Sequence, residues 1–387
     1  MERLKILYNR ILVRFCIIAL SIITFSCDSI EEVDPVVNDP KDQDDDKDEE
    51  KDEEIVAIPL KELFKDYFPI GAAITPHHAD ANTDHGQALI KHFSSVTAEN
   101  VMKPDALQRN KGVYTWDGAD KIVQFAKTNN IQVRGHVLTW HSQTPNWMFY
   151  DQDGVLLSKE VALDQLEDHI TAVMSRYKGD VYAWDVVNEA LFDWDPNGEI
   201  IYREDSPWYK MFGESYIDSA FVFAHRADPN AKLFYNDYNS IFSWKRYKIY
   251  NLVKRLKDNN IPIDGLGIQG HWFVGTSEEN IRTSLDLFRG LGVEIQITEL
   301  DLPVYLSNEE PGSTVYTETF SARQKEAYKM IFQIFLDYSD IITNVTFWGI
   351  GDDASWLDKP GRKAFPFLLD EELQPKPAYF EVQKLLD

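Results

Sequence analysis

Two glutamates, Glu189 and Glu299, each end a run of apolar and β-branched residues. Glu189 follows the stretch WDVVN (184–188), and Glu299 follows EIQIT (294–298). A carboxylate at the end of a buried strand is costly unless it is paired or does chemistry. One such glutamate alone could be an ion-paired structural residue, but two at the ends of different strands favour a catalytic pair.

Two carboxylates on either side of a bond are the minimum equipment for cleaving a glycosidic linkage. One carboxyl group gives the leaving oxygen its proton, and the other meets the oxocarbenium-like carbon. Tryptophans near the ends of predicted strands offer flat apolar faces for sugar rings, while amide, imidazole and ammonium groups can bond the hydroxyls. These tryptophans are Trp140, Trp272, Trp348 and Trp356. Any one of them taken singly fits core packing better than sugar stacking.

Short apolar runs alternate with segments of helical periodicity about eight times along the chain. The predicted strands are 70–75, 94–99, 132–139, 181–188, 232–237, 266–270, 294–299 and 344–349, and the predicted helices include 158–177, 206–226, 244–259, 278–291 and 319–338. This alternation predicts an α/β fold, a (β/α)8 TIM barrel forming a single domain over residues 55–387. An open doubly wound sheet is the alternative, but no glycine-rich phosphate loop follows the first strand.

Polar side chains stand at the end of strand after strand, and in a parallel barrel these ends meet at one mouth. They are Glu99, Asn100, His136, Trp140, His141, Asn188, Glu189, Asn236, Asp237, Tyr238, Gln269, His271, Glu299 and Trp348. A structural role is as plausible as a functional one for His141, whereas His136 is expected to act in the site.

Seven short motifs, in order, resemble the family 10 glycoside hydrolases, the endo-xylanase family. They are SVTAENVMK (95–103), RGH (134–136), WHSQTP (140–145), WDVVNEA (184–190), YNDYN (235–239), GIQGH (267–271) and ITELD (297–301). The resemblance extends from about residue 60 to residue 386. It is weakest after the eighth strand, where the course of 350–354 between Trp348 and Trp356 is not predicted.

The resemblance implies an endo-1,4-β-xylanase that acts on xylan and xylo-oligosaccharides by a retaining double displacement. Glu189 would be the acid/base and Glu299 the nucleophile. Asn188 would bond the sugar 2-hydroxyl, and His271, held by Asp301, would keep Glu299 ionised. The substrate-binding residues would be Glu99, Asn100, Lys103, His136, Trp140, Gln143, Gln269, Tyr238, Trp348 and Trp356. No cofactor and no metal are expected.

The loop 193–204 happens to fit the spacing of an EF-hand calcium loop. It lies between a predicted strand and its helix, without the flanking helices of that motif. Ser206 and Pro207 after it are typical of a helix N-cap and first helical position. These features favour a loop without metal, and the sequence leaves calcium binding open.

Two other functions are compatible with parts of the pattern. One is another retaining barrel β-glycanase acting on glucan or mannan, but the stretch from Thr97 to Lys103 most resembles xylanases. The other is a non-catalytic surface glycan-binding lipoprotein. Such a protein could lose either glutamate, yet both are present here together with His271 and Asp301.

The N-terminal 27 residues predict an export signal of the lipoprotein type. Basic residues precede an apolar run that stops at Ser26-Cys27, and Cys27 is the expected lipidation site. The sequence holds two cysteines, Cys16 and Cys27, so no disulfide or thiol chemistry is expected after residue 27.

Residues 28–54 contain fifteen acidic residues and three lysines, a net charge of −12, and predict a disordered linker. The whole chain has a net charge of −25, which disfavours nucleic acid and anionic membranes as partners. We therefore expect a monomer that contacts a membrane only through its lipid anchor. The acidic run soon after Cys27 resembles the surface-export signals of some Gram-negative lipoproteins, which implies the outer membrane and the cell surface of a Gram-negative bacterium.

Overall fold

The computed structural model describes residues 56–386, apart from residue 194 and residues 196–198. The predicted signal (1–27), its Cys27 and the predicted linker (28–54) lie outside the described residues. In the described part, no helix combines the length and the apolar character needed to cross a bilayer.

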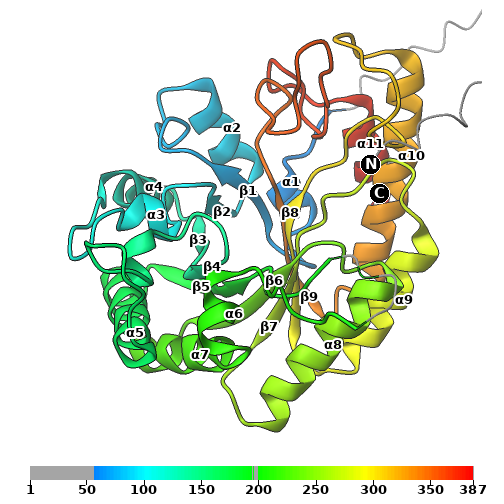
Figure 1. The fold of residues 1–387 in the computed structure, drawn as a ribbon. Helices are drawn as coiled ribbons and strands as arrows, with labels where there is room; N and C mark the ends of the chain where they lie inside the picture. The colour runs from blue at the N-terminus through cyan, green and yellow to red at the C-terminus, as the bar shows by residue number, and fades with distance from the viewer. Residues whose placement is uncertain (1–55, 194, 196–198, 387) are drawn as a thin grey trace, which may run out of the picture. The chain divides into compact units, whose positions relative to one another are not determined.

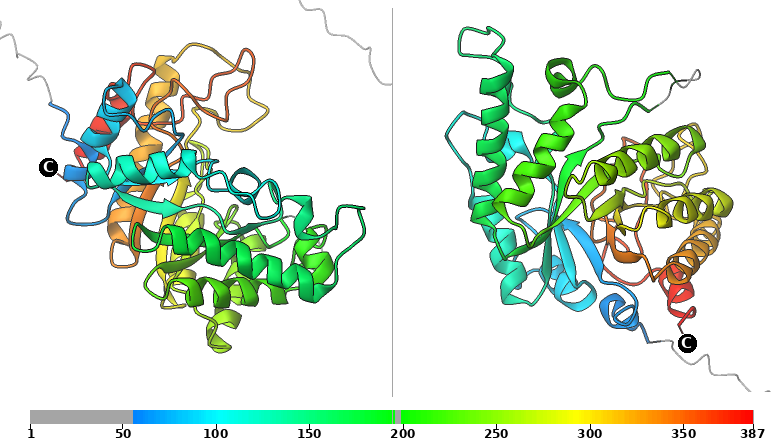
Figure 2. Two further views of the ribbon diagram at one scale, coloured as in Figure 1. Left: turned by 90° about the vertical axis from the view of Figure 1, so that its left-hand side faces the viewer. Right: turned by 90° about the horizontal axis from the view of Figure 1, so that it is seen from below.

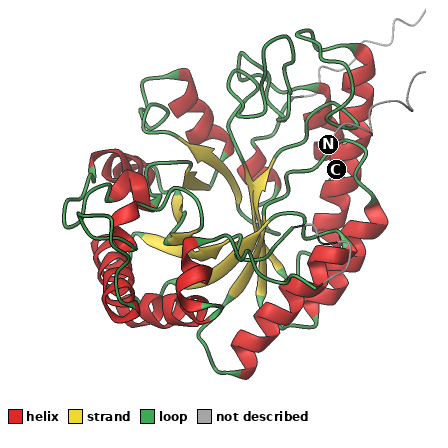
Figure 3. Ribbon diagram, in the orientation of Figure 1, coloured by secondary structure: helices red, strands yellow, loops and turns green. Residues whose placement is uncertain are grey.

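The strands form a closed parallel barrel (Figures 1 and 3). They are β1 Ile70–Ile74, β2 Ser95–Ala98, β3 Gln132–Gly135, β4 Thr139–Trp140, β5 Val181–Asn188, β6 Lys232–Asp237, β7 Gly265–Ile268, β8 Glu294–Leu300 and β9 Ile342–Phe347. Pairing runs from β1 through β2, β3 and β5 to β9, and β9 pairs with β1 in parallel to close the ring. The predicted barrel is confirmed, and the open doubly wound alternative is wrong.

The helices surround this barrel on its outside (Figure 2). They are α1 Leu60–Leu63, α2 Asp84–His92, α3 Pro104–Leu107, α4 Asp117–Thr128, α5 Lys159–Arg176, α6 Pro207–Phe212, α7 Ser215–Ala227, α8 Ser243–Asp258, α9 Glu278–Arg289, α10 Glu318–Asp337 and α11 Pro377–Gln383, with a 3-10 turn at Asn146–Met148. Because helices cover the outer face and side chains fill the inner one, every residue of β1 and β2 is buried.

The predicted strand 132–139 is two strands, β3 and β4, separated by a cis peptide bond between His136 and Val137. Both pair with β5, so together they occupy one strand position of the barrel. Gly135 at the end of β3 allows a close approach, because a Cβ atom there would lie 2.2 Å from the ring of Trp184.

The predicted helix 206–226 is also divided, into α6 and α7, by Gly213 with a φ of 63°. Its ψ of −145° completes a backbone conformation that glycine adopts far more readily than other residues, and the helix ends there. Pro207 occupies the first helical turn as predicted, but Ser206 makes no capping hydrogen bond with its side chain. Position and proline were therefore predicted correctly, and the capping contact was not.

Candidate active site

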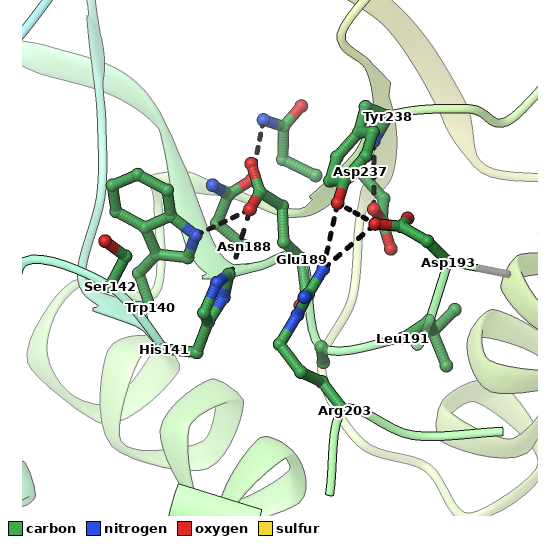
Figure 4. Close-up of polar contacts among 12 residues, drawn as sticks. Trp140, His141, Ser142, Asn188, Glu189, Leu191, Asp193, Arg203, Asp237 and Tyr238 are labelled. Atoms are coloured by element: carbon green, nitrogen blue, oxygen red, sulfur yellow. Dashed lines mark hydrogen bonds and ion pairs between the residues drawn. The ribbon is translucent and has the colours of Figure 1, made fainter. Parts of the chain in front are cut away.

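Glu189 directly follows β5 and has a left-handed backbone with a φ of 54°. Its N–H donates to the carbonyl of Asn236 on the neighbouring strand β6 at 2.9 Å. A positive φ is uncommon outside glycine, and such strained residues cluster at functional sites. The backbone turn lifts the Glu189 side chain out of the strand and into the mouth (Figure 4).

The carboxylate of Glu189 accepts hydrogen bonds from two neutral groups. Trp140 Nε1 donates to Oε2 at 2.9 Å, and Gln269 Nε2 donates to Oε1 at 2.9 Å. His141 Nδ1 lies 3.9 Å from Oε2 (Figure 4). Burial, followed by the positive charge of Arg203, lowers the pKa of His141 to about 4, so this ring is uncharged at neutral pH. Glu189 can therefore exchange a proton without breaking a direct ion pair.

Glu299 is the second-to-last residue of β8, and its exposed fraction is 5%. Its N–H donates to the carbonyl of Gln269 at 2.7 Å. One carboxylate oxygen accepts from Asn236 Nδ2 at 2.8 Å, and the other lies 3.2 Å from His271 Nε2. Both oxygens of the buried carboxylate are thus held.

His271 connects Glu299 to Asp301, because its Nδ1 lies 2.8 Å from Asp301 Oδ2. Burial alone would lower the pKa of His271, but the charge of Asp301 and its hydrogen bond, together with Glu299, raise it to about 10. Burial likewise opposes ionisation of Glu299, yet the hydrogen bond from His271 and the nearby imidazoles lower the Glu299 pKa below its usual value. At neutral pH this arrangement gives an imidazolium between two carboxylates.

A chain of amides joins the two glutamates. Asn236 Nδ2 donates to Glu299 and also to Asn188 Oδ1, the latter at 3.0 Å. Gln269 Nε2 donates to Glu189 and, at 3.3 Å, to the same oxygen of Asn188. Thr298 fixes the Asn236 amide by donating to its oxygen at 2.7 Å.

The sequence places Asn236 at the barrel mouth but predicts no catalytic or binding role for it. Its position at the end of β6 was the available signal.

Glu99, Asn100 and Lys103 lie together after β2, as predicted. Lys103 Nζ donates to Asn100 Oδ1 at 2.9 Å, and Asn100 Nδ2 donates to Glu99 Oε1 at 3.0 Å. The ammonium also lies 5.2 Å from the centre of the Trp140 ring. Burial lowers the pKa of Lys103, against the effect of the surrounding carboxylates. This set forms a polar wall within electrostatic reach of Glu189 and Glu299.

His136 is buried beneath the mouth. Its Nδ1 lies 2.8 Å from Asp185 Oδ2, and Arg134 donates to both oxygens of the same carboxylate. The His136 ring meets the edge of Trp348 with centroids 5.5 Å apart. The structure thus places His136 against the predicted sugar-binding tryptophan.

The tryptophans separate into two groups. Trp356 is 57% exposed, donates through Nε1 to Asp301 at 2.8 Å and lies edge-on to His271 at 5.1 Å. Trp272, by contrast, is 5% exposed and packs on Phe335. The suggestion that Trp272 could stack on sugars is wrong, because the ring belongs to the core.

Tyr238 lies on the side of Glu189 opposite Trp140 (Figure 4). Its hydroxyl donates to Asp193 and accepts from Arg203 Nη2 at 3.0 Å. Arg203 Nε donates in turn to the backbone carbonyl of Glu189 at 3.1 Å. Tyr238 is therefore tied to the segment that carries Glu189.

Gln143 is exposed in the loop after β4, with a φ of 45°. Its backbone oxygen accepts from the N–H of Asp105 at 2.8 Å. In the described part of the chain, no hydrogen bond joins its side chain to Glu189 or Glu299. Its predicted role depends on contact with substrate alone.

Asp193, the first residue of the calcium-like loop, forms ion pairs with two basic side chains. Lys245 Nζ lies 2.9 Å from its Oδ1, and Arg203 Nη2 lies 3.5 Å from its Oδ2. Residues 194 and 196–198 lie outside the described part, and the described residues contain no cluster of three or more His, Cys, Asp or Glu suited to a metal. The ion pairs of Asp193 argue against calcium there.

The sequence profile of Glycosyl hydrolase family 10 matches residues 59–385. Endo-1,4-beta-xylanase B of Paenibacillus barcinonensis is 44% identical over 328 residues, which cover 84% of this chain and 97% of that protein. A beta-1,4-xylanase of Dictyoglomus thermophilum is 46% identical over 331 residues, covering 84% and 90% of the two chains. The crystal structure of xylanase XynB from Paenibacillus barcinonensis, complexed with a conduramine derivative, superposes with a TM-score of 0.80 at 43% identity and covers 85% of this chain and 98% of that one. The resemblance noted in the motifs is confirmed, and the chain belongs to glycosyl hydrolase family 10.

Proposed function

We propose that this enzyme is an endo-1,4-β-xylanase that cleaves internal xylosidic bonds with retention of configuration. The observation that carries this proposal is the asymmetry between the two carboxylates. Glu299 is buried against an imidazolium that keeps it ionised, whereas the carboxylate of Glu189 accepts hydrogen bonds from the neutral donors Trp140 and Gln269. A nucleophile and an acid/base need these two different environments.

In the first step, Glu299 attacks the anomeric carbon and forms an ester bond to the sugar. The bond to the leaving oxygen breaks as Glu189 transfers its proton to that oxygen. In the second step, Glu189 removes a proton from water, which attacks the same carbon and releases Glu299. The two inversions restore the β-configuration and return both groups to their starting protonation states.

The remaining residues would hold the sugars in this position. Asn188 would bond the 2-hydroxyl next to the nucleophile, where a hydrogen bond strengthens in the transition state. Glu99, Asn100, Lys103 and Gln269 would bond hydroxyls on the non-reducing side of the cleaved bond. The aromatic and histidine faces would come from Trp140, Trp348, Trp356, Tyr238 and His136, with Gln143 at the rim.

A direct test compares reducing-sugar release from xylan, cellulose and mannan by the purified protein, with Glu299→Gln as a matched control. We expect release from xylan that the Glu299→Gln variant loses. Faster release from cellulose or mannan would favour a different β-glycanase. Binding of xylan without release would favour a glycan-binding protein.

The location of the enzyme is a separate proposal. Its supports are the basic and apolar signal before Cys27, the acidic segment after it, and a family that acts on a polymer too large to enter a cell. We propose a monomer exported through this signal, anchored to the outer membrane by lipid on Cys27 and displayed on the cell surface.

A further inference from the structure

Lys245 is a fully buried lysine whose position the stability of its own helix does not explain. It lies in the first turn of α8, and its side chain is 0% exposed. A cation in the first turn of a helix is opposed by the helix dipole, and a buried ammonium is costly unless its donors are bonded. The reason for a lysine here must therefore lie in what its side chain contacts.

The Lys245 ammonium bonds the segment after β5 and the end of β6. Its Nζ donates to the backbone oxygen of Leu191 and to Asp193 Oδ1, both at 2.9 Å. Asp237 Oδ1 lies 3.0 Å from the same nitrogen. An ammonium has three donors and no acceptor, so this set of partners is complete. Leu191 and Asp193 closely follow Glu189 in the chain (Figure 4), and the ammonium is thus bonded to the segment that carries the acid/base.

The turn at Glu189 depends on hydrogen bonds from other parts of the barrel. The Glu189 N–H donates to the carbonyl of Asn236 at 2.9 Å, and the Glu189 carbonyl accepts from Arg203 Nε at 3.1 Å. The next N–H, that of Ala190, donates to the hydroxyl of Tyr235 at 3.2 Å. Glutamate rarely adopts a φ of 54° without such support. The direction of the Glu189 side chain therefore depends on the groups that hold this backbone.

Two of these supporting groups are held in turn by the partners of Lys245. The Tyr235 hydroxyl donates to Asp237 Oδ2, and the other oxygen of Asp237 faces Lys245. Burial raises the pKa of Asp237 to about 6, and the charge of Lys245 acts against this rise. Asp193 lies between Lys245 and Arg203, because Arg203 Nη2 is 3.5 Å from Asp193 Oδ2. Two routes thus connect the Lys245 ammonium to the backbone of the turn.

We propose that Lys245 is a positioning residue that orients Glu189 for proton transfer to the leaving oxygen without itself touching substrate. The inference rests on the proposed xylanase function and adds a residue to its first step. A carboxyl group transfers its proton only within hydrogen-bond reach of the acceptor, and a misplacement of about 1 Å can cost ~10²-fold in rate. Removal of the ammonium takes a donor from three acceptors at once, so the turn loses both routes of support.

The experiment uses two aryl xylobiosides with the same sugar part and different leaving groups. A dinitrophenolate leaves without a proton, whereas a phenolate needs one, so the ratio of their kcat/KM values reports proton donation by Glu189. We expect Lys245→Met to lower kcat/KM for the phenyl substrate at least ~10-fold and for the dinitrophenyl substrate less than ~3-fold. A lysine that merely stabilises the fold would affect both substrates by the same factor.

Lys376→Met is the matched control, because Lys376 is a similarly buried lysine with the same kinds of partner. Its Nζ bonds Asp352 Oδ2 at 2.6 Å and two backbone oxygens of the loop after β9 at 3.0 and 2.8 Å. None of these groups belongs to the turn at Glu189. Lys376→Met should change both kcat/KM values equally, since the two substrates share their sugar part. An equal change in Lys245→Met would overturn the inference.

Tyr235→Phe tests the same connection if Lys245→Met does not fold. It removes the hydroxyl between Ala190 and Asp237 and keeps the ring in the core. We expect kcat/KM for the phenyl substrate, relative to the dinitrophenyl substrate, to fall by about threefold, as for the loss of one hydrogen bond. An unchanged ratio in this variant would contradict the inference alone. Failure of the wild type to cleave either substrate would contradict the proposed activity and the inference with it.

Discussion

Replacing Asp301 by asparagine tests how Glu299 is kept ionised. Asp301 Oδ2 lies 2.8 Å from His271 Nδ1, and the pKa of His271 rises from 6.5 to about 10. Such a rise corresponds to ~5 kcal/mol in favour of the protonated ring, as an order of magnitude. Because the charge of Asp301 is the main favourable cause, Asp301→Asn should leave His271 largely neutral at pH 8.

A neutral His271 no longer supplies positive charge beside Glu299, so the pKa of Glu299 should rise. The acidic limb of kcat/KM against pH reports the ionisation of the free enzyme's nucleophile. We expect this limb to move to higher pH by at least about one unit, equivalent to ~1.4 kcal/mol. The assay is a pH profile on an aryl xylobioside, with Trp356→Phe as the control that removes the other hydrogen bond to Asp301 without removing charge. A uniform fall in rate with an unmoved acidic limb would show that Asp301 merely orients the ring.

The same substitution has a consequence for stability. The folded-state pKa of His271 exceeds its unfolded value, so its contribution to stability is complete below about pH 6.5 and disappears as the pH rises through about 10. Asp301→Asn should therefore lower the thermal midpoint more at pH 6 than at pH 10.5. An equal decrease in the thermal midpoint at the two pH values would indicate that the substitution acts through packing and not through the charge of His271.

Four further outcomes are expected. Proton NMR in the first minutes of hydrolysis should show the β-anomer of the new product, and an initial α-anomer would remove Glu299 from the role of nucleophile. Glu189→Ala should flatten the alkaline limb of the pH profile, and should slow hydrolysis of xylan by a factor of about 10²–10⁴ but hydrolysis of an aryl xylobioside far less. Added azide should restore turnover, with a β-glycosyl azide as the product. Equal slowing of both substrates without rescue by azide would show that Glu189 has a structural role. Xylan should be cleaved far faster than cellulose because Trp348 would crowd the hydroxymethyl group of glucose, and Trp348→Ala should narrow the difference in kcat/KM; equal wild-type rates would contradict this. Cys27→Ser should move the protein from the membrane fraction to the supernatant, and continued sedimentation with membranes would argue against lipidation.

The sequence was sufficient to predict the barrel and the two glutamates because both depend on local patterns. Runs such as 181–188 and 294–298 are buried on both faces, so their ends can be located from hydrophobicity alone. The split of 132–139 and of 206–226 was missed, since each break depends on close packing and backbone geometry at one residue, as at Gly135 and Gly213.

Side-chain environments were harder to predict than positions. Trp272 lies near a strand end like Trp348, yet only the packing of α10 residue Phe335 on its ring shows that it is core. The sequence places Asn236 at the barrel mouth, but its contacts with Asn188 and Glu299 follow from the position of β6 between β5 and β7. The contact of His85 in α2 with Asp353 in the loop after β9 joins residues 268 positions apart, and no local sequence pattern predicts such a contact.

The amide chain from Asn236 through Asn188 to Gln269 also bears on when the carboxylates of Glu189 and Glu299 are oriented. Its members are uncharged, and each is held by a strand end of the barrel. The entropy of orienting the two carboxylates is therefore lost when the protein folds and not when a sugar arrives. Because Asn236 bonds Glu299 and Gln269 bonds Glu189, both carboxylates are already oriented in the structure before any sugar is bound. The strand ends that carry the amides therefore act as a fixed frame for the site.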